Sequence, residues 1–150
     1  MIDQILEKYP TGVKVVFKSF PLSSHKQAYK ASLYALAAGK QGKFKEMYHK
    51  IFENDTWRGL RNDEDLPLKL AAELGLDVGQ LKKDIEDPAL SALIDQEMNQ
   101  LKVLGNSYET DDYAGVRLAV PKFFVNGKEP NLGKRTLADW SRVIDAELKK

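Results

Sequence analysis

The 150-residue chain contains no cysteine and only two histidines. Without cysteine it can form no disulfide bond, no thiolate metal site and no thiolate nucleophile. Two histidines are also too few for a histidine-rich metal site. Because cytosolic and exported proteins can both lack cysteine, this absence does not assign a compartment.

No charge of one sign dominates, since 23 lysine and arginine residues stand against 22 aspartate and glutamate residues. Neither a nucleic-acid partner nor an acidic substrate is therefore implied. No apolar run approaches the ~18 residues of a membrane span, so no span is expected. The first residues, Met1 to Lys8, do not have the pattern of a signal peptide.

What the chain does contain is a set of amphipathic segments, in which apolar residues recur at spacings of three and four. Asp77 with Gln80, and Thr136 with Asp139, have the pattern of helix-capping pairs. The spacing predicts helices over residues 2–9, 23–39, 44–52, 66–74, 77–85, 87–104 and 136–148.

Two segments rich in β-branched and aromatic residues, 13–18 and 121–126, predict β-strands. Asn126-Gly127 after the second strand is a strong hairpin signal, with a short return strand from Lys128 to Leu132. Roughly eighty mainly helical residues separate the two strands. This order predicts an α/β fold with a helical subdomain at about 23–105, within a single domain 1–150.

Several motifs in this order resemble the DsbA-like branch of the thioredoxin superfamily over nearly the whole chain. They are Lys8-Tyr9-Pro10 followed by Gly12 to Phe17, Phe20-Pro21-Leu22 with His25 and Ala28, Ala37 to Phe44 with Met47, His49 and Phe52, and Gly115 to Lys128 around Val120-Pro121.

The resemblance implies a thioredoxin-like α/β fold, and it also shows what this chain does not contain. In that family a strand and a Cys-x-x-Cys motif precede the helix that corresponds to residues 2–9. Both would lie before Met1, so we expect a truncated domain whose N-terminal strand is missing. The open strand edges would then pair with each other directly, or exchange with a second copy to form a homodimer.

The resemblance assigns the substrate-binding role to Val120 and Pro121. It implies a cis bond before Pro121, with the main chain of Val120 pairing with an extended peptide or protein substrate. No residue is predicted to be catalytic, because the Cys-x-x-Cys is absent. No cofactor and no metal are predicted.

Other candidate residues have plainer interpretations. Glu46 and His49 form a Glu-x-x-His pattern, but di-iron sites need a matching pattern on another helix. His25 near a helix start is interpreted as structural. The acidic residues Glu109, Asp111 and Asp112 lack the spacing of a calcium loop, which favours a solvated loop. Trp57 is expected to cover the helical subdomain or a peptide groove.

The leading functional hypothesis is a domain of a DsbA-like thiol-disulfide oxidoreductase, inactive as this chain because it has no redox cysteines. Such a parent oxidises or isomerises disulfides in extracytoplasmic proteins, periplasmic or secreted. The alternative is a naturally cysteine-free thioredoxin-like module that binds peptides or proteins. A third is a helical scaffold that docks through the alanine stripe Ala28, Ala31, Ala35 and Ala38.

Overall fold

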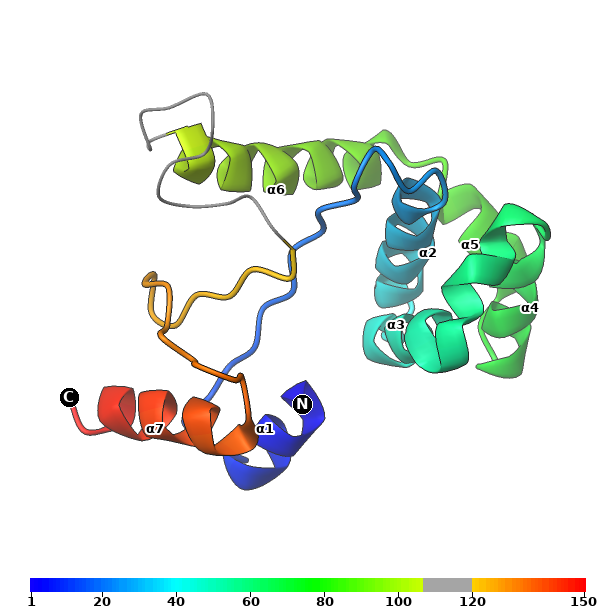
Figure 1. Ribbon diagram of the computed structural model, residues 1–150. Helices are drawn as coiled ribbons and strands as arrows, with labels where there is room; N and C mark the ends of the chain where they lie inside the picture. The colour runs from blue at the N-terminus through cyan, green and yellow to red at the C-terminus, as the bar shows by residue number, and fades with distance from the viewer. Residues whose placement is uncertain (107–119) are drawn as a thin grey trace. The chain divides into compact units, whose positions relative to one another are not determined.

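The computed structural model describes residues 1–106 and 120–150, with residues 54, 55 and 104–106 described by their backbone alone (Figure 1). The chain divides into two compact units. Unit 1 comprises Met1–Phe17 and Leu118–Lys150, and unit 2 comprises Lys18–Arg117.

Helices account for almost all the regular structure. Unit 1 contains α1 (Ile2–Lys8) and α7 (Leu137–Leu148). Unit 2 contains α2 (Ala28–Lys40), α3 (Phe44–Phe52), the 3-10 helix η1 (Glu53–Arg61), α4 (Leu66–Glu73), α5 (Val78–Asp84) and α6 (Pro88–Asn106). Among the described residues, no helix is both long enough and apolar enough to cross a membrane.

The predicted α/β fold is wrong for this structure, because the described residues form no sheet. Residues 13–18 and 122–124 have no regular secondary structure, and Val125 and Lys128 form only an isolated antiparallel bridge. Nor do the two expected strands pair with each other within the described part of the chain. β-Branched and aromatic residues favour extended backbone, but a strand also needs a partner for its N–H and C=O groups.

Helix positions were predicted more accurately than strands, with two local differences. α2 begins at Ala28 instead of Ser23, because turn bonds from the His25 N–H to Leu22 and from the Ala28 N–H to His25 occupy the preceding residues. Between the predicted helices 44–52 and 66–74, the residues around Trp57 form the 3-10 helix η1.

Unit 2 is held by one apolar core to which most of its helices contribute. α2 packs against α3, α5 and α6, and α3 packs against α4. The alanine stripe of α2 allows this close packing, since Ala31, Ala35 and Ala38 are all buried among the unit's own side chains. The stripe is therefore not a free docking surface. The largest fully buried apolar side chains of this core are Met47, Ile51 and Leu81.

Side-chain caps fix the starts of two helices. The predicted capping box of α7 is confirmed, since Thr136 and Asp139 each accept a hydrogen bond from the other's backbone N–H. At α5 the Asp77 side chain accepts from the Gln80 N–H at 2.8 Å. The N–H of Asp77 donates to the Gln41 side chain at 2.9 Å, so a residue that follows α2 completes the cap of α5.

Lys40 connects the end of α2 to α5 and to the start of α6. Its ammonium lies 2.8 Å from Asp84 and 3.0 Å from Asp87. Hydrogen bonds from Lys40 and then Gln80 hold the pKa of Asp84 below its ordinary value. In turn, the hydrogen bonds to Asp84 and then to Asp87 raise the pKa of Lys40.

The core of unit 1 is smaller. Its buried members are Ile5 of α1, Leu132, and Trp140 and Ile144 of α7. The α1 helix packs against α7 (Figure 1), and polar bonds reinforce the contact. Lys8 Nζ donates to Ser141 Oγ at 2.6 Å, and the Tyr9 hydroxyl donates to Asp145 at 2.7 Å.

Replacing Asp84 with Asn should lower stability in a pH-dependent way. A carboxylate whose pKa is lowered by folding contributes stability that is fully present above the ordinary aspartate pKa of about 3.9 and lost as the pH falls through the folded pKa. Denaturant unfolding should therefore give a lower free energy of unfolding for Asp84→Asn than for wild type at pH 7. This difference should vanish in acid. Asp95→Asn, an exposed change on α6, is the control. An equal difference in the free energy of unfolding at pH 7 and at strongly acidic pH would contradict the role of the Asp84 carboxylate.

Trp140→Ala should unfold unit 1 while leaving unit 2 folded. Truncating a buried tryptophan costs about 3–5 kcal/mol, and the described residues of this core include four buried ones. Hydrogen exchange measured by mass spectrometry should show lost protection in α1 and α7 and unchanged protection in α2 to α6. Leu148→Ala, at a half-exposed position of α7, is the control. Loss of protection in unit 2 would show that the units do not fold independently.

Candidate functional site

The predicted substrate-binding residues open an extended stretch of unit 1, which we call the 120–124 segment. Val120 is half-buried and Pro121 is exposed. The peptide bond between them is cis. Neither residue forms a backbone–backbone hydrogen bond with another described residue. Pro121 has no N–H to donate, whereas the remaining main-chain groups of the segment can still form hydrogen bonds.

A tight turn ends this stretch. Asn126 and Gly127 have positive φ angles of 47° and 78°, as the two central residues of a type I′ turn require. The Val125 N–H donates to the Lys128 carbonyl at 2.8 Å, and the Lys128 N–H donates to the Val125 carbonyl at 3.0 Å. The Asn-Gly turn is thus confirmed, but the predicted return strand contributes only this one bridge.

Phe123 anchors the 120–124 segment to α7. Its ring lies 5.1 Å from the Trp140 ring, centroid to centroid, with the planes at 80°. This edge-to-face arrangement is the favourable one for two aromatic rings. Phe123 and Val125 both pack against the core of unit 1. Because side chains alternate along extended backbone, these contacts direct the side chain of Phe124 away from the core.

The outward face of the segment exposes one large apolar side chain. Phe124 is 42% exposed although it is a large aromatic residue. Lys122, on the same side by alternation, donates to Glu129 at 2.5 Å and is largely covered. No backbone–backbone bond joins residues 121–124 to another part of the described chain. The segment therefore presents an aromatic side chain beside main-chain groups that form no backbone–backbone bond with another described residue.

Charged groups surround this segment and the turn. The Arg135 guanidinium lies over the Phe123 ring, 5.7 Å from its centroid, in the geometry of a cation–π contact. At the turn, Asn126 donates to Glu147 at 3.0 Å. Hydrogen bonds from Lys150 and then Asn126 lower the pKa of Glu147. Glu147 thus stays a carboxylate that fixes the position of the turn.

The other sequence candidates belong to unit 2 or lie outside the described residues. His25 lies 5.9 Å from the Trp57 ring, and Trp57 packs against the core of unit 2, as expected for a residue that covers the helical subdomain. Glu46 pairs with Lys43 at 3.0 Å. Within the described residues no group of three or more histidine, aspartate or glutamate side chains could hold a metal ion. Residues Glu109, Asp111 and Asp112 lie outside the described part.

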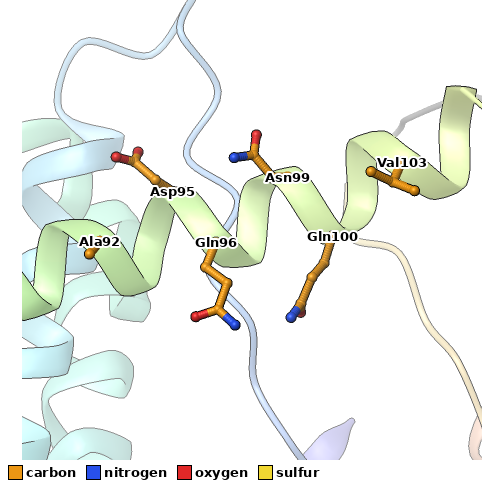
Figure 2. Close-up of a pocket in the computed structure, with 6 residues that line it drawn as sticks. All are labelled: Ala92, Asp95, Gln96, Asn99, Gln100 and Val103. Carbon is orange, nitrogen blue, oxygen red and sulfur yellow. The ribbon is translucent and has the colours of Figure 1, made fainter.

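A pocket lies along the exposed face of α6 in unit 2 (Figure 2). Its described lining residues follow one another at alternating spacings of three and one, as on a single helix face. No second element supplies a described side chain to enclose a ligand, and the polar groups offered are amides and one carboxylate beside two small apolar side chains. The lining residues are Ala92, Asp95, Gln96, Asn99, Gln100 and Val103.

Two residues of the candidate site were not singled out from the sequence. The outward direction of Phe124 follows from alternation with Phe123 and Val125, so the period-two pattern could have indicated it. Arg135 carries no such signal. It adopts a positive φ of 59° just before the cap of α7, and its position over Phe123 depends on how the turn folds back.

These features define an all-helical pair of units with an extended, proline-led segment anchored on the last helix. The family model described as thioredoxin matches residues 1–146, so the chain belongs to the thioredoxin family. The chain is also similar to Na(+)/H(+) antiporter NhaA 1 of Mycolicibacterium gilvum (strain PYR-GCK), with 28% identity over 151 aligned residues. That match covers 97% of this chain but only 21% of the antiporter. No solved structure matches the chain.

Gly127→Val should destabilise unit 1 by about 1–2 kcal/mol, because a left-handed conformation costs a branched residue roughly that much. A Cβ at this position would meet nothing within 4 Å, so the expected cost comes from the backbone alone. Gly127→Asn should cost less, since asparagine tolerates positive φ. Hydrogen exchange of α7 measures the effect. Equal protection in both variants would contradict the proposed origin of the cost.

Proposed function

We propose that this chain is a DsbA-like member of the thioredoxin family that binds an extended polypeptide along the 120–124 segment. Val120 and Pro121 open the binding segment, and Phe124 supplies its apolar contact. The chain does not exchange disulfides itself, because it has no cysteine to provide the attacking thiolate. It works without a cofactor, and an extracytoplasmic location follows from the DsbA-like assignment.

The division of the chain supports the DsbA-like assignment. Unit 1 is assembled from both ends of the chain, whereas the helical unit 2 is one continuous stretch, Lys18–Arg117. A helical unit placed between two parts of a smaller unit is the organisation that the DsbA-like motifs imply. The family match over residues 1–146 supports the broader thioredoxin assignment.

The observation that carries the binding proposal is the accessible 120–124 segment. An extended peptide gains affinity by pairing its backbone with unpaired backbone groups, and specificity by placing alternate side chains in apolar contacts. The segment offers both, since its residues 121–124 form no described backbone–backbone bond and Phe124 is exposed. Phe123, packed on Trp140, holds the backbone in place for that pairing.

A second candidate is an interaction module without any redox role. The similarity to the antiporter favours it, because nearly all of this chain matches about one fifth of that larger protein. A module of this kind would bind one folded partner through the same segment, as an accessory to a transport protein. Binding of an unfolded polypeptide favours the first candidate, and binding of a folded partner alone favours the second.

Phe124→Ser should weaken binding of an unfolded polypeptide by about 5- to 30-fold, as expected for removing an aromatic anchor. The probe is a reduced, carboxymethylated, fluorescently labelled protein fragment, followed by anisotropy. Val103→Ser is the matched control, because Val103 is also an exposed apolar residue, 65% exposed, but lies on α6 of unit 2. Binding that is equally weakened in both variants, or unchanged in Phe124→Ser, would contradict the proposal.

Light scattering on the unliganded protein accompanies this measurement. A monomer that binds the fragment supports peptide binding at the segment. A homodimer whose formation is lost in Phe124→Ser would instead assign the segment to a second copy of the chain.

A further inference from the structure

The near neutrality of the whole chain conceals an uneven distribution of charge. Unit 1 carries nine lysine and arginine residues against six aspartate and glutamate residues, whereas unit 2 carries 14 against 16. The positive surplus therefore belongs to the unit that contains the 120–124 segment. The net charge of the whole chain gave no reason to expect an acidic partner, because the positive net charge of unit 1 and the negative net charge of unit 2 nearly cancel.

Part of that surplus lies directly beside the segment. Arg135 is exposed and contacts the Phe123 ring, and it has no carboxylate partner among the described residues. Lys128 is exposed and sits opposite Val125 in the bridge. Lys122 differs, because Glu129 already neutralises it. Arg135 and Lys128 thus lie beside the residues on either side of Phe124. Arg135 has no described carboxylate partner, whereas the charge of Lys128 also acts on Glu147, where it helps to lower the pKa of that carboxyl.

We infer that the polypeptide bound by the 120–124 segment has an apolar centre flanked by aspartate or glutamate residues. This inference rests on the proposed function and specifies its substrate class. The apolar centre contacts Phe124, while the acidic flanks lie beside Arg135 and Lys128. Electrostatic complementarity of this kind selects among partners and speeds association.

The same charges argue against two other occupants. A basic peptide would bring like charge to Arg135 and Lys128, which is unfavourable. A second copy in a symmetric dimer would place two identical positive surfaces against each other. In neither arrangement do the positive charges of Arg135 and Lys128 meet a negative charge.

Three peptides of about eight residues, matched in length to one strand, test the inference. Each has the same central run of valine and phenylalanine, flanked by aspartates, by serines or by lysines. The aspartate peptide should bind about 3- to 10-fold more tightly than the serine peptide, as two exposed ion pairs allow. The lysine peptide should bind most weakly. Raising the salt concentration from about 0.05 M to about 0.5 M should reduce the differences in affinity among the three peptides.

The double variant Lys128→Gln with Arg135→Gln should abolish the preference for aspartate while still binding the serine peptide. Lys82→Gln with Lys83→Gln removes the same charge from exposed positions of α5 in unit 2 and should keep the preference. Equal binding of all three peptides would overturn the inference but leave the proposed function standing. Binding of none of them, or a homodimer that blocks them, would overturn both.

Discussion

The edge-to-face contact between Phe123 and Trp140 is the interaction on which the candidate site depends. It ties an extended stretch, which forms no sheet with the described residues, to α7. Once the inward side chain is fixed, alternation along the backbone directs Phe124 outward. The accessible face is therefore a product of packing on the opposite face.

The two units distribute stability and binding between them. Unit 2 has a broad core built on alanines that bring α2 close to its neighbours, together with a lysine that joins two aspartates at helix ends. Among the described residues, the apolar core of unit 1 has four buried members, whereas that of unit 2 has 13. Elements that bind ligands are commonly drawn from the less stable parts of a protein. This division is consistent with placing the binding segment in unit 1.

Local patterns in the sequence predicted local structure, and they failed where structure needs a distant partner. The Thr136–Asp139 cap and the Asn126-Gly127 turn depend on a few adjacent residues and were predicted correctly. The strand at 13–18 was not, because its valines favour extended backbone without supplying the neighbour that a ladder requires. The position of Arg135 over Phe123 also escaped prediction. It arises only after the chain between Lys128 and Thr136 folds back, and no periodicity encodes that path.

The small core of unit 1 has a thermodynamic consequence. A polypeptide that binds only the folded form adds its own association free energy to the folding equilibrium, in proportion to the logarithm of its concentration. The folded population of unit 1 would then depend on how much partner is present, whereas that of unit 2 would not. For this third of the chain, folding and ligand binding are then coupled in a single equilibrium.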